Sequence, residues 1–262
     1  MNILDKIIES KRKSLKEKKD WFSIKKLEAS PFYERDCESL VKKLNESGTT
    51  GIIAEFKRRS PSKGIINNKA KIEEVVSAYE NYGAAGISIL TDEEYFGGNN
   101  EDLIKAREIV DIPLLRKDFI IDEYQVVEAK SIGADVILLI AACLTPAEVK
   151  RLAAIAKELG LEILLELHEE NELEHICDDI DLIGINNRDL RTFEVDIERS
   201  LRMSEKIPTN KIKIAESGIS SVENIRQFKQ NGFKGFLIGE NFMKEENPGE
   251  VFRKFISELK NE

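Results

Sequence analysis

The stretch "DVILLIAACLTPAEVKRLAAIAKELGLEILLEL", Asp135–Leu167, contains one complete unit of the pattern that decides the fold. Two short apolar runs flank an amphipathic segment that begins near Thr145 and closes at Gly160, which are residue types typical of helix starts and ends. Continuous apolar runs are typical of strands buried on both faces, and an intervening helix joins parallel strands. The stretch therefore predicts a β–α–β unit.

The same pattern recurs along the chain from about residue 50. The strand-like runs are "GIIAEF", "GISIL", "IPLLRKDF", "DVILLI", "LEILLEL", "LIGINN", "KIKIAES" and "GFLIGE", with helix-like segments between them. Eight units of roughly 20 to 30 residues have the size of a (β/α)8 TIM barrel. A doubly wound open sheet is the alternative, but no GxGxxG or GxxxxGK[ST] turn follows the first run. We predict an α/β fold, namely a (β/α)8 TIM barrel.

The residues before the first strand predict additional helices. The segments "ILDKIIESKRKSLKEKKDW" and "RDCESLVKKLNES" have helical spacing of apolar residues. We expect residues 1–48 to form an N-terminal helical extension laid against the barrel. Because no Pro/Gly/Ser-rich linker interrupts the chain, we predict one domain, residues 1–262.

Composition excludes several classes of protein. No apolar run approaches the roughly 20 residues needed to cross a bilayer, and the N-terminus lacks the features of a signal peptide, so we expect a cytoplasmic protein that does not bind membranes. Three cysteines without CxxC spacing predict neither disulfides nor a zinc site. The formal net charge of −9 argues against nucleic-acid binding. An anionic ligand would need a local cationic pocket, and the cluster "KRRSPSK", Lys57–Lys63, is a candidate.

Charged and polar residues close five of the predicted strands. The carboxyl ends of barrel strands build the active site in this fold. Any one of these residues could form a simple ion pair, but burying several ionised groups costs several kcal/mol each without strong partners. We therefore predict that they form an active site at one mouth of the barrel: Glu55, Lys57, Lys117, Glu166, Asn186, Arg188 and Glu216.

The last two strands lead into glycine-containing turns, "IAESGIS" and "FLIGEN". In many barrels these two loops bind phosphate through backbone amides. Gly218 and Gly239 would allow close approach of the ligand, and Ser217 and the Glu240 amide could donate hydrogen bonds. Ser60 could close the site from the opposite edge. The alternative is that both glycines only form tight turns.

Several motifs together resemble the indole-3-glycerol phosphate synthase family, a carboxy-lyase family of tryptophan biosynthesis. They are "IIAEFKRRSPSKG", "LLRKDFIIDEYQV", "LLELH", "LIGINNRDL", "IAESGI" and "FLIGE", in order from about residue 50 to 245. The resemblance implies decarboxylating and dehydrating ring closure of 1-(2-carboxyphenylamino)-1-deoxyribulose 5-phosphate. It implies a small phosphorylated substrate and no cofactor or metal. We expect a monomer.

The same resemblance implies roles for individual residues. Lys117 matches the general acid on the ketone oxygen, Glu166 the general base in dehydration, and Lys57 the partner of the substrate carboxylate. The residues that orient these groups or bind substrate are Glu55, Asn186, Arg188, Glu216, Ser60, Pro61, Phe96, Phe119, Ser217, Gly218, Gly239 and Glu240. Glu240 departs from the family pattern, because many relatives have a small residue there.

A lysine acid works best with a lowered pKa, and we expect desolvation and neighbouring cations to lower the pKa of Lys117, although nearby carboxylates oppose this. His168 is expected to be a packing residue or to lie behind the site, His175 on the surface, and Trp21 in a packed position. Phosphoribosylanthranilate isomerase and the histidine-pathway isomerases are alternative functions with the same phosphate loops. The pattern is also compatible with a Schiff-base aldolase, which uses a nucleophilic lysine, and with a non-enzymatic scaffold.

Overall fold

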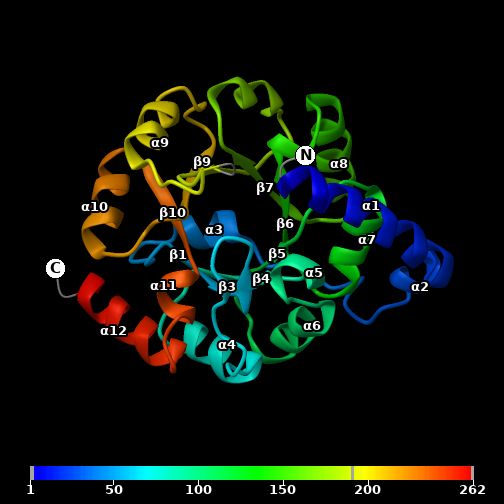
Figure 1. Cartoon of the computed structure of the whole chain (residues 1–262), viewed down its shortest axis with the longest axis horizontal. Helices are drawn as coiled ribbons and strands as arrows, with labels where there is room; N and C mark the ends of the chain where they lie inside the picture. Colours follow the sequence, from blue (N-terminus) through cyan, green and yellow to red (C-terminus); the bar gives the residue numbers. More distant parts are fainter. Residues whose placement is uncertain (1–2, 190–191, 261–262) are drawn as a thin grey trace.

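Eight parallel strands close into a barrel in the computed structural model, which describes residues 3–189 and 192–260 (Figure 1). Neighbouring strands follow the order β1-β10-β9-β8-β7-β6-β5-β4, and β4 pairs with β1 to complete the ring. The strands are β1 Ile52–Phe56, β4 Gly86–Leu90, β5 Leu114–Lys117, β6 Val136–Ile140, β7 Glu162–Leu167, β8 Leu182–Asn186, β9 Ile212–Glu216 and β10 Phe233–Ile238. The predicted TIM barrel is confirmed. Residues 1–2 of the predicted extension and Leu190 of the "GINNRDL" motif lie outside the described residues.

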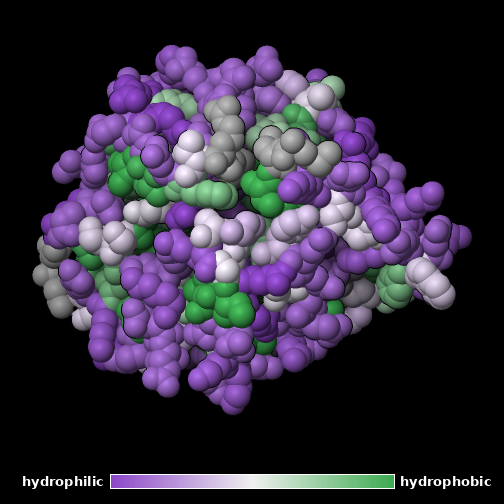
Figure 2. Space-filling view, in the orientation of Figure 1, coloured by the Kyte–Doolittle hydropathy of each residue, from purple (hydrophilic) through white to green (hydrophobic). Residues whose placement is uncertain are grey.

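Helices surround the strands (Figure 1), and the face shown in Figure 2 is mostly hydrophilic, as expected when apolar helix stripes face inward. The larger helices that follow barrel strands are α4 Ile72–Asn81, α6 Asn100–Ile109, α7 Glu123–Ser131, α8 Pro146–Glu158, α9 Ile197–Ser204, α10 Val222–Gln230 and α12 Pro248–Lys260. Shorter elements in the loops are the hairpin β2 Arg59–Ser60 and β3 Gly64–Ile65, and the single turns α5 Glu93–Phe96, η1 Ala141–Cys143 and α11 Glu240–Met243.

The connection from β7 to β8 differs from the predicted pattern. It carries a 3₁₀ segment, η2 Glu170–His175, in place of an α-helix. The stretch between these strands, "HEENELEHICDDID", is short and acidic, so it offers few apolar positions for a packed helix.

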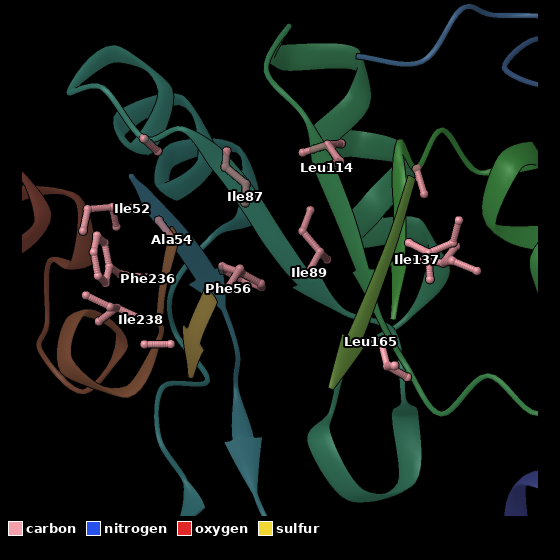
Figure 3. Close-up of a cluster of buried hydrophobic side chains, with 14 of the residues drawn as sticks. Ile52, Ala54, Phe56, Ile87, Ile89, Leu114, Ile137, Leu165, Phe236 and Ile238 are labelled. Carbon is pink, nitrogen blue, oxygen red and sulfur yellow. The ribbon is translucent and has the colours of Figure 1, made fainter. Parts of the chain in front are cut away.

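Alternation along each strand explains why β1 carries charged residues. Ile52, Ala54 and Phe56 point outward into the core between strands and helices (Figure 3). Ile53, the next residue along, belongs to the separate cluster inside the barrel. Since successive side chains alternate between faces, Glu55 shares the inner face with Ile53. The barrel interior is thus apolar in its lower layers and charged where the strands end.

The N-terminal extension closes both ends of the barrel. Helix α3, Leu40–Asn45, places Leu40 and Leu44 against the interior cluster. Helix α1, Ile3–Trp21, lies over the carboxyl ends of the strands, where the Lys11 ammonium is 2.8 Å from Asp92 and 2.7 Å from Asp118. Helix α2, Ile24–Glu28, packs beside α7. The expected packing of Trp21 is wrong, because 83% of this residue is exposed.

A fully buried carboxylate joins the extension to the barrel. Asp135, just before β6, accepts hydrogen bonds from Arg35 at 2.5 Å, from Arg107 at 2.9 Å and from the Leu114 amide at 2.8 Å. The backbone amide of Glu38 donates a further bond at 2.8 Å. Arg35 and Glu38 belong to the extension, so Asp135 holds it against α6 and the start of β5.

Among the residues that the structure describes, no helix is both long enough and apolar enough to cross a bilayer.

Candidate active site

Lys117, at the end of β5, lies at the centre of the charged layer. Its ammonium is 2.8 Å from Glu166 Oε2 on β7 and 2.6 Å from Glu216 Oε2 on β9. Along β8, which lies between these two strands, Glu166 pairs with Gly184 and Glu216 pairs with Asn186. Gly184 and Asn186 are two residues apart and share one face of β8, so the two carboxylates lie on the same face of the sheet near the strand ends. The predicted convergence of strand-end residues is therefore observed.

Glu166 is held through its second oxygen by two further side chains. Asn186 donates a hydrogen bond to Oε1 at 3.1 Å, and His168 Nε2 lies 3.1 Å from the same atom, although it is not aligned for a hydrogen bond. His168 is buried and lies behind Glu166, as expected. The prediction for His175 is wrong, because it is buried with its ring nitrogens 2.9 Å from the Leu144 carbonyl and 3.0 Å from the Glu172 carbonyl.

Two glycines make room for the carboxylates. The Lys57 ammonium is 2.6 Å from Glu55 Oε1, and a Cβ at Gly239 would lie 2.5 Å from the same oxygen. A Cβ at Gly184 would lie 2.0 Å from Glu216 Oε1. Both distances are too short for non-bonded contact, so a side chain at either position would displace the neighbouring carboxylate. The turn after β10 predicted that Gly239 allows close approach of a ligand, and the structure shows that Gly239 also accommodates Glu55.

The pKa values of Lys117, Glu166 and Glu216 are shifted by burial and by their mutual contacts. Burial alone would lower the pKa of Lys117, but attraction to Glu166, Glu216 and Glu55 outweighs it and raises the pKa well above its ordinary value. Burial would raise the pKa of Glu166, but Lys117 and His168 outweigh it and lower the pKa. Burial and the neighbouring Glu166 together outweigh Lys117 and raise the pKa of Glu216 to about 7. The expectation of a lowered pKa for Lys117 is therefore wrong.

The raised pKa of Glu216 predicts a pH-dependent contribution to stability. A glutamate whose pKa is about 7 in the folded state and lower in the unfolded state binds more protons when folded. Its contribution is complete at acidic pH and is lost as the pH rises through about 7. Between pH 5 and pH 8 we expect the free energy of unfolding of the parent to fall relative to that of Glu216→Gln. Urea unfolding of both proteins across this range measures the difference, and parallel curves would contradict it.

One cavity of about 310 Å³ extends over the charged layer. Phe96 and Phe119 form an aromatic wall with ring centroids 6.0 Å apart, and Ile7 of α1 contributes to the lining. Leu138 and Ile140 lie on the strand beside Glu166 and also line the cavity. The cavity therefore combines an apolar slot with ionised groups, which suits a ligand that has both an aromatic ring and charges.

The far end of the cavity is formed by the loops after β8, β9 and β10. Ser217 and Gly218 both have positive φ, 65° and 70°. This conformation is uncommon for serine and occurs often at functional sites. Arg188 Nη1 lies 3.3 Å from Ser62 Oγ, and Arg188 Nη2 lies 3.3 Å from Glu240 Oε2. A guanidinium beside a turn of this conformation can bind an anion.

Comparison with known sequences assigns the family. A model described as indole-3-glycerol phosphate synthase matches residues 4–255. The chain belongs to the indole-3-glycerol phosphate synthase family. A synthase of this name from Bacteroides thetaiotaomicron is 48% identical over 258 residues, covering 98% of this chain and 99% of the relative. Another from Salinibacter ruber is 42% identical, covering 99% of this chain and 97% of the relative.

Solved structures show the same fold in more distant proteins. The tryptophan synthase A-subunit from Pyrococcus furiosus superposes with a TM-score of 0.61 at 16% identity, covering 80% of this chain and 97% of that chain. Thiamine phosphate pyrophosphorylase from Pyrococcus furiosus gives a TM-score of 0.59 at 19% identity, covering 85% of this chain and 100% of that chain. These similarities support the barrel that the synthase family shares with them and say nothing of its chemistry.

Every residue that the synthase resemblance selected lies on the cavity wall. These are Glu55, Lys57, Ser60, Pro61, Phe96, Lys117, Phe119, Glu166, Asn186, Arg188, Glu216, Ser217, Gly218, Gly239 and Glu240. Lys244 and the apolar residues Ile3, Leu4 and Ile7 of α1 also line the cavity, which the sequence did not predict. The helical spacing of Ile3 and Ile7 indicated a buried stripe but not which surface it covers.

Within residues 3–189 and 192–260, no group of three or more His, Cys, Asp or Glu side chains is arranged to hold a metal ion.

Proposed function

We propose that this chain is an indole-3-glycerol phosphate synthase. It would close the pyrrole ring of 1-(2-carboxyphenylamino)-1-deoxyribulose 5-phosphate, releasing carbon dioxide and water. The observation that carries the proposal is the ammonium of Lys117, held between Glu166 and Glu216, in one cavity with an aromatic slot and an anion-binding end. The substrate presents the matching groups, namely an aminobenzoate ring, a ketone and a phosphate.

The cavity supports one orientation of this substrate. The aromatic ring would lie against Phe96, Phe119 and Pro61, with its carboxylate directed at the Lys57 ammonium. Ser60, Arg188, Ser217 and the backbone around Gly218, Gly239 and Glu240 would bind the phosphate. This places the ketone near Lys117, so binding at both ends would hold the reacting carbons together.

Ring closure requires a cation beside the ketone oxygen. The ring carbon that bears the carboxylate attacks the ketone, and negative charge develops on its oxygen. Lys117 is fully protonated at neutral pH, because neighbouring carboxylates raise its pKa. It would stabilise this charge and donate a proton to form a hydroxyl. Loss of carbon dioxide then returns the electrons of the broken carbon–carbon bond to the aromatic ring.

Dehydration would follow on the Glu166 side. Glu166, oriented by Asn186, would accept the proton from the methylene carbon next to nitrogen as the hydroxyl leaves. That hydroxyl would depart as water, which carries the proton first supplied by Lys117 and a second proton that Glu166 passes on from the methylene carbon. Solvent would then return a proton to Lys117. Glu55 would hold Lys57 in position, and Glu216 would hold Lys117.

The test is turnover of the carboxyphenylamino-deoxyribulose phosphate by purified protein, followed by indole fluorescence. We expect indole-3-glycerol phosphate and carbon dioxide in equal amounts. Absence of turnover would contradict the proposal. Borohydride treatment with substrate present, followed by mass spectrometry, separates this function from a Schiff-base aldolase. An adduct on Lys57 or Lys117 would favour the aldolase.

We also propose that residues 1–262 act as a single-domain monomer in the cytoplasm. The support is that elements from one chain, including α1 of the extension, supply the described lining of the cavity. Sedimentation of the active enzyme would test this, and a dimer at working concentration would contradict it.

A further inference from the structure

The Glu240 side chain lies at the anion-binding end of the cavity and contacts two cations. Its Oε1 is 3.3 Å from the Lys63 ammonium, and its Oε2 is 3.3 Å from Arg188 Nη2. Each carboxylate oxygen therefore faces a different positive charge. The Glu240 side chain is 36% exposed and the Arg188 side chain is 21% exposed. Both therefore remain accessible to a ligand that enters the cavity.

These contacts join three separate loops. Lys63 lies in the turn between β2 and β3, Arg188 follows β8, and Glu240 begins α11. Arg188 also reaches Ser62 of the same turn. Glu240 thus connects the loop after β1 with the loop after β8 across the site where the phosphate would bind.

Most of the positive charge in the cavity is already paired with carboxylates, so little of it is available to a phosphate. Its lining includes five acidic and four basic residues, and Glu55, Glu166 and Glu216 already engage Lys57 and Lys117. A phosphate carries nearly two negative charges at neutral pH. Arg188, which lines the cavity together with Ser217 and Gly218, is already partly neutralised by Glu240.

We propose that the Glu240 carboxylate is an internal competitor of the substrate phosphate. In the free enzyme it would hold Lys63 and Arg188 in place of a ligand anion. Phosphate would bind only as the carboxylate turns away from these cations, so Glu240 would weaken binding of the substrate and hasten release of the phosphorylated product. This inference rests on the proposed function, since it concerns the phosphate end of the same cavity.

The direct test is calorimetric titration of inorganic phosphate into the parent enzyme, Glu240→Gln and Glu246→Gln at constant ionic strength. Glutamine keeps the shape of the side chain and removes its charge. Partly exposed ion pairs are worth up to about 1 kcal/mol each, so we expect Glu240→Gln to bind phosphate about three- to tenfold more tightly. Glu246 is exposed and makes the same change in net charge, and its variant should bind like the parent.

A double-mutant cycle with Lys63 tests the mechanism. If Glu240 occupies Lys63 in the free enzyme, Lys63→Gln should weaken phosphate binding less in the parent than in Glu240→Gln. Equal losses in the two backgrounds would overturn the proposal. The proposal would also be overturned if Glu240→Gln bound phosphate no more tightly than the parent. It would likewise be overturned if neither protein bound phosphate detectably.

Turnover separates this inference from the function it rests on. In Glu240→Gln we expect a lower KM and stronger inhibition by the product, without an increase in kcat. An active parent whose Glu240→Gln variant binds phosphate no better would overturn this inference alone. An inactive parent would overturn the proposed function, whatever the phosphate titrations give.

Discussion

Lys117→Ala is expected to lower kcat by about 10² to 10⁴-fold, the usual contribution of a general acid. The loss has a specific physical reason, because Lys117 is the ammonium that contacts both Glu166 and Glu216. Without it, no cation would stand between these carboxylates to stabilise the ketone oxygen. The measurement is the steady-state rate of indole formation with purified variant and parent.

The fold of Lys117→Ala should survive, since the two carboxylates can share a proton once the ammonium is gone. Circular dichroism and the unfolding midpoint test this. Lys105→Ala is the matched control, because Lys105 makes an exposed ion pair with Glu73 and neither residue lines the cavity. It should retain parental kcat. Turnover by Lys117→Ala near the parental rate would contradict the assigned role.

Asp135→Asn should cause a large decrease in the free energy of unfolding. The Asp135 side chain is fully buried and receives bonds from two guanidinium groups and two backbone amides. Removing one partner of a buried ion pair costs about 3 to 5 kcal/mol, because the other charge is left uncompensated. We expect a decrease in the free energy of unfolding of at least about 3 kcal/mol, measured by urea denaturation at neutral pH.

Asp181→Asn provides the control for Asp135→Asn. Asp181 likewise accepts a bond from a strand amide, that of Ile163 at 2.9 Å, and contacts the Lys157 ammonium at 2.8 Å. Lys157 is 41% exposed, so water can replace its partner. Asp181→Asn should therefore lower the free energy of unfolding clearly less than Asp135→Asn does. Similar small losses for both variants would show that Asp135 does not anchor the extension.

Much of the fold and of the candidate site was predictable, because side chains alternate between the two faces of a strand with a fixed period of two residues. Glu55 and Lys57 are two residues apart, as are Asn186 and Arg188, so each pair faces one side of its strand. Parallel strands end at the same rim, which brings Lys117, Glu166 and Glu216 together whatever the loops do. The alternation of apolar residues therefore predicted the position of the charged layer.

Properties that depend on distances between side chains were not predictable. The sign of the pKa shift of Lys117 depends on how many carboxylates lie within contact of it, and the sequence does not give their separations. His175 was misplaced because its partners are backbone carbonyls, which no residue pattern reveals. The contact of Glu240 with Lys63 joins loops whose conformation depends on packing.

The closure of the barrel has a consequence for synthesis on the ribosome. β1 is the first strand to be made, yet one of its two edges pairs only with β10, through Ile52 with Phe236 and Ala54 with Ile238. Until β10 emerges, that edge is open and available to other nascent chains. The seam between the first and last strands also carries Glu55 beside Gly239. The charged rim should therefore form in one late step, after β10 has left the exit tunnel.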